Sequence, residues 1–210
     1  MSNDTAITTR LLFVRHGQTN TAVNHVFCGT TEAPLTSTGR WQAQALAERL
    51  RHESIDVLYC SPQQRALETA APIADALRLE IRQQDALREI DFGLWENRSR
   101  TELTREYPRL LSNWDKGLWM SNPPDGETRQ AVIARVVPCI IELSGAHTGK
   151  TVLVVSHRIT LCLLIGHMLD MTLFSSRRLL LSPASLTELH MTEDQVQMIS
   201  FNDTSHLVAS

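Results

Sequence analysis

The chain has 210 residues, 42% of them hydrophobic and 20% charged, and its formal net charge at pH 7 is -3. This length and composition predict one globular domain, residues 1–210, with a hydrophobic core of its own. The slightly acidic charge and the lack of any run of 18 apolar residues argue against nucleic acid or a membrane as the partner.

Three short apolar runs predict buried β-strands, at residues 11–14, 55–59 and 152–155. The first is followed by a helical pattern over residues 34–50, with Thr36 as its expected N-cap. The second is followed by a helical pattern over residues 61–77, with Ser61 as the expected N-cap and Pro62 at the first helical position. Pro72 lies inside this pattern, and we expect it to kink or split the helix.

The remaining patterns complete an α/β arrangement. Residues 159–169 are apolar almost all round, which predicts a buried helix after the third strand. Residues 96–128 carry Tyr107, Trp114 and Trp119 among charges and predict an inserted, lid-like helical segment in which the tryptophans pack. Residues 185–189 and 196–201 predict a final antiparallel hairpin. Alternation of strands and helices indicates an α/β fold with a mainly parallel sheet.

Basic residues and histidines follow each predicted strand. Arg15 and His16 end the first, Arg65 falls in the helix after the second, and His157 and Arg158 end the third. Because ligands bind beyond the carboxyl ends of strands in such sheets, these side chains are expected to converge. Guanidinium groups match phosphate oxygens, and a neutral imidazole among cations can attack phosphorus. The pattern predicts a phosphoryl-transfer site.

The predicted site also needs backbone that can approach the anion and a group that protonates the leaving alkoxide. Residues outside the three strand ends can supply both. Gly29 would let the backbone come close to an anion. A leaving alkoxide needs a proton, and Glu89 is the preferred donor, with Asp91 and Glu96 as competing candidates. Position in the sequence does not choose among these three carboxylates.

The thiols and the N-terminus bear on the compartment and on metal binding. The four cysteines lie far apart and lack the paired C-x-x-C spacing of zinc sites, so we expect free thiols. The N-terminal residues lack a signal-peptide pattern, and we expect a cytoplasmic protein.

Seven segments in order carry a family resemblance: "RHGQT", "FCG", "PLTSTGRWQA", "CSPQQRALETA", "LREIDFGLWEN", "PPDGET" and "VLVVSH". Together they resemble the histidine phosphatase superfamily, which includes the cofactor-dependent phosphoglycerate mutases. The resemblance implies a three-layer α/β/α fold and chemistry without a metal or a cofactor. It also implies that His16 becomes phosphohistidine, that Arg15, Arg65 and His157 hold the phosphoryl group, and that Glu89 is first the acid and then the base.

The chain departs from the family pattern at two positions. Ala22 stands where the family usually has an asparagine that binds phosphate, and Asn20 or Asn24 is the expected substitute. Arg158 stands where the family most often has glycine, and it is either a substrate contact or a structural residue. The other histidines, including His25, share no spacing and are interpreted as surface or core residues.

Three functions compete. The leading hypothesis is a metal-independent phosphomonoesterase that hydrolyses a small phosphate ester through a phosphohistidine intermediate. The second is a cofactor-dependent phosphoglycerate mutase, which is less favoured because mutases of the family resemble one another in a longer chain and in a "YG" where this chain has "FG". The third is a phosphate-binding protein without catalysis. An exposed apolar sheet edge would favour a homodimer.

Overall fold

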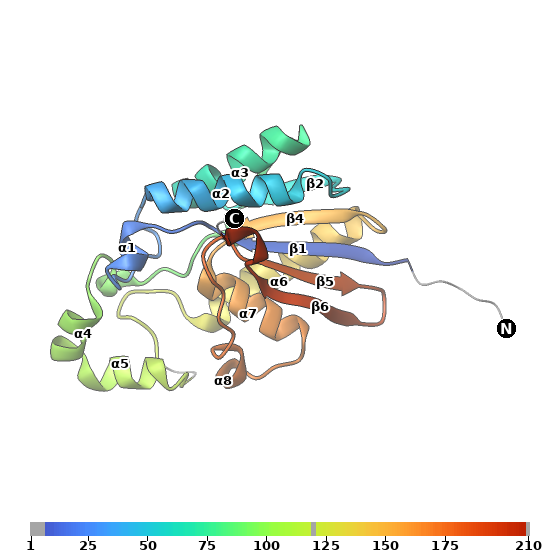
Figure 1. The fold of residues 1–210 in the computed structure, drawn as a ribbon. Helices are drawn as coiled ribbons and strands as arrows, with labels where there is room; N and C mark the ends of the chain where they lie inside the picture. Colours follow the sequence, from blue (N-terminus) through green and yellow to red (C-terminus); the bar gives the residue numbers. More distant parts are fainter. Residues whose placement is uncertain (1–6, 119–120, 209–210) are drawn as a thin grey trace.

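A mixed six-stranded sheet forms the centre of the computed structural model, which describes residues 7–118 and 121–208 (Figure 1). Its strands follow the order β3-β2-β4-β1-β5-β6. They span β1 Thr9–Arg15, β2 Val57–Cys60, β3 Ile81–Gln83, β4 Thr151–Ser156, β5 Leu186–Met191 and β6 Val196–Asp203. The first four in the spatial order run parallel, whereas β5 is antiparallel to both of its neighbours, β1 and β6. The predicted sheet and terminal hairpin are confirmed.

Helices cover both faces of this sheet (Figure 1). On one face lie α2 and α3, and on the other lie α6 and α7. The helices are α1 Asn20–Val23, α2 Ser37–Leu50, α3 Gln64–Leu77, α4 Arg100–Glu106, α5 Pro108–Asp115, α6 Arg129–Ala146, α7 Arg158–Met168 and α8 Leu173–Ser176. The three-layer α/β/α fold implied by the resemblance is therefore confirmed.

Strand β1 shows why the apolar runs are continuous. Successive side chains of a strand point to opposite faces of the sheet. Leu12 and Val14 join the core beneath α2 and α3, whereas Leu11 and Phe13 join the core beneath α6 and α7. Because both faces are covered by helices, every position of the strand centre is apolar, and the strand end is held rigidly at the edge where β1 and β4 finish.

The two helices predicted after β1 and β2 have different outcomes. Thr36 caps α2 as predicted, since its hydroxyl accepts a hydrogen bond from the Gly39 N–H at 2.9 Å. The start predicted for α3 is wrong: the helix begins at Gln64, after Ser61 and Pro62. The Ser61 hydroxyl is instead 2.7 Å from a ring nitrogen of His157, which is a bond within the site described below.

Helix α3 also differs in its interior. It runs through Pro72 without a break, so the expected split does not occur. Leu67 and Leu77 are only half-buried although they are apolar. Its buried face comprises Arg65, Ala66, Thr69, Ala70, Ile73 and Ala74. The short strand β3 and the helix α6 have no counterpart among the elements expected above.

The segment 96–128 contains α4 and α5, which Figure 1 shows to one side of the helical layers. Trp114 is buried there and its ring lies 5.9 Å from that of Trp95 and 6.0 Å from that of Phe92, so its predicted packing role is confirmed. Trp119 lies outside the described residues. None of the helices in the described ranges has the length and apolar character needed to cross a membrane.

Candidate active site

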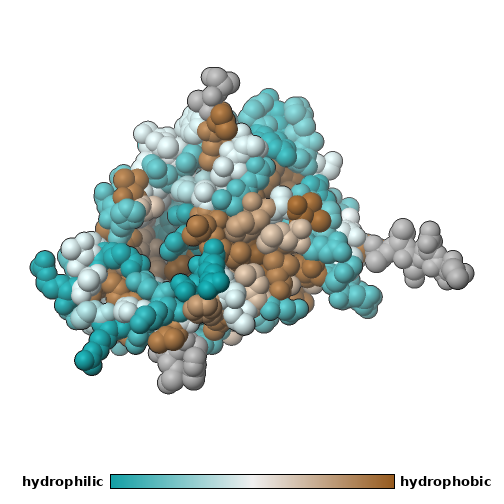
Figure 2. Space-filling model, turned by 60° about the horizontal axis from the view of Figure 1, so that its bottom comes forward, coloured by the Kyte–Doolittle hydropathy of each residue, from teal (hydrophilic) through white to brown (hydrophobic). Residues whose placement is uncertain are grey.

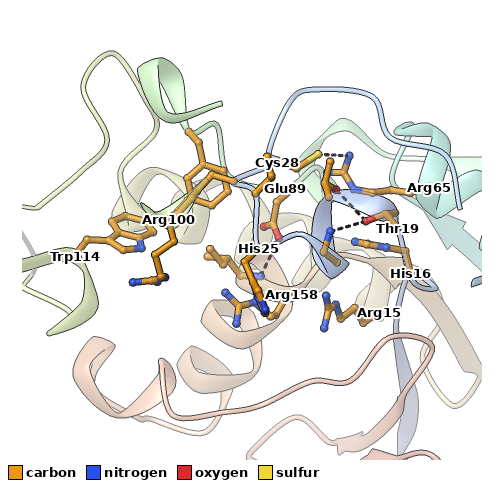
Figure 3. A pocket seen from close by; sticks show the side chains of 16 residues that line it. Arg15, His16, Thr19, His25, Cys28, Arg65, Glu89, Arg100, Trp114 and Arg158 are labelled. Carbon is orange, nitrogen blue, oxygen red and sulfur yellow. Dashed lines mark hydrogen bonds between the residues drawn. The ribbon is translucent and has the colours of Figure 1, made fainter. Parts of the chain in front are cut away.

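A cavity of about 450 Å³ opens at the carboxyl ends of β1 and β4 (Figure 3). Five of the predicted site residues line it: Arg15, His16, Arg65, Glu89 and Arg158. They come from β1, α3, the segment after β3, and the start of α7. The expected convergence of strand ends therefore occurs.

His16 lies at the end of β1 and is nearly buried, with 6% of its surface exposed. Its Nδ1 is 2.7 Å from the carbonyl oxygen of Gly17. Because a carbonyl only accepts, Nδ1 carries the proton and Nε2 keeps its lone pair. Burial lowers the pKa of His16 well below its ordinary value, and the charges of Arg15 and Arg65 lower the pKa further. A neutral imidazole with a free Nε2 thus faces the cavity.

His157 is fully buried beside His16, with 5.1 Å between the ring centroids. Its Nδ1 accepts a hydrogen bond from Nε of Arg65 at 3.1 Å, so Nε2 carries the proton and donates to Ser61 Oγ at 2.7 Å. Burial is the main cause of its strongly lowered pKa, followed by the charge of Arg65. Both ring nitrogens therefore have protein partners, and His157 orients Arg65.

The guanidinium of Arg65 is buried and held by carbonyl groups of the 28–31 loop. It donates to the carbonyl of Gly29 at 2.7 Å and to that of Thr31 at 2.9 Å. The N–H of Gly29 points instead to the carboxylate of Glu96, at 3.0 and 3.1 Å from its two oxygens. Gly29, expected to bind the anion directly, thus lies behind Arg65 and helps to orient it.

Three further guanidinium groups line the cavity, those of Arg15, Arg100 and Arg158. Arg15 donates to the carbonyl of Leu181 at 2.6 Å, and its buried Nε has no hydrogen-bond partner in the described part of the chain. Burial lowers the pKa of Arg15 to about 10, with the charge of Arg158 as the next cause. These observations describe a site with more positive charge than the protein itself neutralises.

Glu89 is the one of the three competing carboxylates that lines the cavity within residues 7–118 and 121–208. Its oxygens accept hydrogen bonds from the N–H groups of Ile159 and Thr160, both at 3.1 Å, in the first turn of α7. Asp91 instead accepts from the Gly93 N–H at 2.7 Å, and Glu96 binds the 28–31 loop. The geometry therefore favours Glu89 as the acid.

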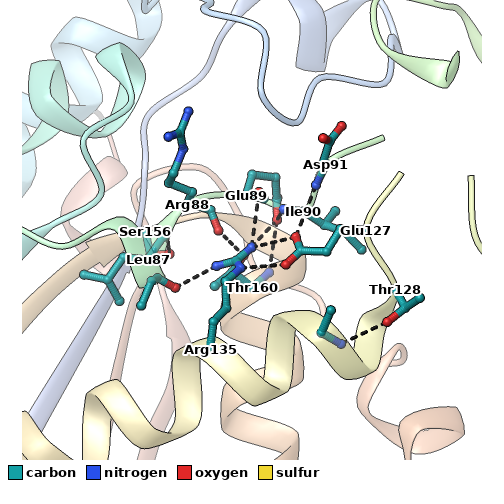
Figure 4. A network of polar contacts seen from close by, with 12 residues as sticks. Leu87, Arg88, Glu89, Ile90, Asp91, Glu127, Thr128, Arg135, Ser156 and Thr160 are labelled. Atoms are coloured by element: carbon teal, nitrogen blue, oxygen red, sulfur yellow. Dashed lines mark hydrogen bonds and ion pairs between the residues drawn. The ribbon is translucent and has the colours of Figure 1, made fainter. Parts of the chain in front are cut away.

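The backbone of Glu89 is fixed by a network around Arg135 of α6 (Figure 4). Arg135 donates to the carbonyls of Ala86 at 2.6 Å and of Glu89 at 3.3 Å, and it binds both carboxylate oxygens of Glu127 at 2.7 and 2.9 Å. Glu127 also accepts from the Asp91 N–H at 3.3 Å. Residues on both sides of Glu89 are thus tied to one helix.

Other residues at the cavity were not foreseen as site residues. Arg100, His25 and Phe27 line it, and so does Ala22, whereas Asn20 is exposed and is not among the lining residues. The family motif "FCG" contains Phe27, but no signal in the sequence pointed to Arg100, because its position depends on how the 96–128 segment folds. His25 is a surface residue, as one of the two sequence interpretations predicts, but it also lines the cavity.

Comparisons with known proteins agree with this geometry. The sequence model of the histidine phosphatase superfamily (branch 1) matches residues 11–204. The chain is 32% identical over 202 residues to phosphoserine phosphatase 1 of Hydrogenobacter thermophilus, and the match covers 94% of each protein. It is 35% identical over 162 residues to the adenosylcobalamin/alpha-ribazole phosphatase of Escherichia coli, covering 77% of this chain and 80% of that one. The fold is similar to that of Bacillus stearothermophilus YhfR, with a TM-score of 0.91 and 28% identity over 95% of this chain and 100% of that one. The chain therefore belongs to the histidine phosphatase superfamily.

Proposed function

We propose that this protein hydrolyses small phosphate monoesters through a phosphohistidine formed on His16, without a metal ion. The observation that carries the proposal is the neutral His16 ring, whose Nε2 lone pair is free in a cavity lined by Arg15 and Arg65. A lowered pKa keeps this nucleophile unprotonated near neutral pH. The named phosphatases among its relatives support the same reaction class.

The reaction proceeds in two displacements on phosphorus. In the first, His16 Nε2 forms a bond to phosphorus while the ester P–O bond breaks, and Glu89 gives a proton to the departing alkoxide. In the second, Glu89 takes a proton from water while the oxygen of this water attacks phosphorus, the bond between phosphorus and His16 Nε2 breaks, and inorganic phosphate leaves the free imidazole. Arg15 and Arg65 stabilise the charge on the non-bridging oxygens in both transition states.

His157 has a supporting part in this scheme. It fixes the guanidinium of Arg65 by accepting a hydrogen bond from Nε. Direct contact with the phosphoryl group, as the resemblance implies, requires its Nε2–H to leave Ser61 Oγ for a phosphoryl oxygen. Nearby, Ser156 donates to the carbonyl of Leu87 at 2.7 Å and plays no part in the chemistry.

The test is hydrolysis of p-nitrophenyl phosphate by the wild type, by His16→Ala, and by His52→Ala as a control in an exposed histidine. His16→Ala should lose at least about 1,000-fold in kcat/KM, and acid-labile labelling of the protein by the ester should vanish with it. Retention of most activity in His16→Ala would refute the proposal.

Vanadate should inhibit the hydrolysis of p-nitrophenyl phosphate, and EDTA should leave its rate unchanged. With 3-phosphoglycerate, phosphorus NMR should show inorganic phosphate; formation of 2-phosphoglycerate would identify a mutase instead.

We also propose a domain organisation, a class of partner, an oligomeric state and a compartment for this protein. We take residues 1–210 as one domain in which the 96–128 segment covers the site, supported by Arg100 and Trp114 at the cavity. Its partners are small esters rather than nucleic acid or membranes. A homodimer is supported by the exposed Met198 and Ile199 on the edge strand β6 and by hydrophobic residues gathered on one face (Figure 2). Four free thiols fit the cytoplasm. Light scattering and cell fractionation test these two points.

A further inference from the structure

The cavity is lined by four guanidinium groups, those of Arg15, Arg65, Arg100 and Arg158. Glu89 is the only carboxylate among its described lining residues. Arg100 is neutralised from outside by Asp115, to which it donates two hydrogen bonds at 2.7 and 3.0 Å. Arg158, by contrast, makes no ion pair or hydrogen bond through its side chain with any residue in the described ranges. Arg158 is therefore available to a ligand in addition to Arg15 and Arg65, the two cations assigned to the phosphoryl group.

The position of Arg158 is set by the start of α7. Arg158 is the first residue of this helix, and the next two N–H groups, of Ile159 and Thr160, bind the carboxylate of Glu89. Figure 3 shows the labelled residues running from Arg15 and His16 on one side, through Glu89 and Arg158, to Arg100 and Trp114 on the other. Arg158 thus lies on the side of Glu89, where the leaving alcohol is released.

The cavity has one set of cations for the phosphoryl group and a separate cation, Arg158, for the alcohol part of the ester. The phosphoryl group has its own cations, since Arg15 lies next to His16 and Arg65 is oriented by His157. A guanidinium beside the general acid instead faces the alcohol part of the ester. The cavity of about 450 Å³ extends past the phosphoryl position to walls formed by Phe27 and Trp114, so an alcohol of several carbons fits.

We propose that Arg158 selects phosphate esters whose alcohol part carries a second acidic group, either a carboxylate or another phosphate. This inference rests on the proposed function, because it assigns the alcohol side of the cavity from the roles of His16 and Glu89. An acidic group there forms charge-assisted hydrogen bonds with the guanidinium and relieves its repulsion with Arg15.

Matched pairs of esters test the proposal. The wild type should have a kcat/KM about 10- to 100-fold higher for 3-phosphoglycerate than for glycerol 3-phosphate, which replaces the carboxylate by a hydroxymethyl group. The ratio of kcat/KM for fructose 1,6-bisphosphate to that for fructose 6-phosphate tests a second phosphate in the same way. Comparing the preferences in the two ester pairs distinguishes a carboxylate from a phosphate as the selected group. Arg158→Met should remove the preference while changing kcat/KM for p-nitrophenyl phosphate and Ki for inorganic phosphate by less than about 3-fold.

Two further variants control for charge and for folding. Arg158→Lys keeps the charge without the planar fork and should retain part of the preference. Arg178→Met removes a positive charge from a residue that is not among the cavity lining and should behave as the wild type. Because Arg158 is exposed, its variants should keep the wild-type thermal midpoint.

Several results would overturn the inference. Equal losses for both members of a pair, together with a raised Ki for phosphate, would place Arg158 on the phosphoryl group. A wild type that hydrolyses p-nitrophenyl phosphate but does not prefer acidic esters would refute the inference and leave the proposed function intact. If no ester were hydrolysed, the proposed function would fail, and calorimetric binding of the same ester pairs to wild type and Arg158→Met would still decide on Arg158.

Discussion

Glu96 is expected to control phosphate binding although its carboxylate is not part of the cavity lining. Its oxygens accept hydrogen bonds from the Thr31 hydroxyl and from the backbone N–H groups of Gly29, Thr30, Thr31 and Phe92. The same loop turns the carbonyls of Gly29 and Thr31 toward Arg65. The carboxylate therefore positions the loop, and the loop positions the guanidinium of Arg65, which we propose binds the phosphoryl group.

Glu96→Gln keeps the size of the side chain and replaces one acceptor oxygen by an NH₂ group. Placed at Oε2, this group would face the N–H of Thr31, which now lies 3.3 Å from that oxygen. Placed at Oε1, it would face the N–H groups of Thr30 and Phe92, at 2.9 and 3.0 Å. A hydrogen bond to a charged group contributes about 1.5–3 kcal/mol, and Glu96 is half-buried, so we expect a loss of about 1–3 kcal/mol in the free energy of unfolding.

Displacement of the 28–31 loop in Glu96→Gln should also weaken the binding of phosphate by Arg65. Ki values for phosphate and vanadate should rise about 10-fold, measured by inhibition of p-nitrophenyl phosphate hydrolysis well below the thermal midpoint of the variant. Glu188→Gln is the matched control, because Glu188 accepts from Arg10 at 2.9 Å and from His190 at 2.7 Å in the sheet. It should lower stability without changing either Ki. An unchanged Ki in a destabilised Glu96→Gln would refute the positioning role.

Three other variants or conditions follow from the structure. Because burial lowers the pKa values of His16 and His157 below the ordinary 6.5, the unfolded chain binds protons below pH 6.5 that the native state does not. Stability should thus fall as the pH drops from 6.5, by up to about 1.4 kcal/mol per pH unit for each ring, and urea midpoints of His16→Gln should depend less on pH. Ala22→Asn adds a donor at the cavity and should lower the Ki for phosphate about 2- to 10-fold; an unchanged Ki would show that the amide does not reach the anion. Gly93→Ala should cost about 2–3 kcal/mol of stability, because φ is +48° and the added Cβ would lie 2.2 Å from the Pro124 oxygen, whereas Gly145→Ala meets no atom within 4 Å and should not destabilise.

The sequence alone was sufficient for the parts of the site that lie at strand ends. Arg15 is the last residue of β1, and His16 and His157 directly follow β1 and β4, so a strand prediction places all three at the same edge of the sheet. The role of Ser61 was missed because a helix cap and a partner for a histidine use the same hydroxyl, and only the tertiary structure decides between them. Arg100 was missed because the fold of the 96–128 segment brings it to the cavity.

The two ends of the 96–128 segment each bind a different part of the proposed active site. Glu96, at its start, holds the loop that orients Arg65, and Glu127, near its end, holds the arginine that fixes the backbone of Glu89. Between these anchors the helices α4 and α5 supply Arg100 and Trp114 to the cavity wall. In the proposed mechanism, changes between the anchors therefore alter the surface that meets the alcohol part of the substrate. Changes at the anchors themselves instead affect Arg65, the proposed phosphoryl ligand, and Glu89, the proposed general acid.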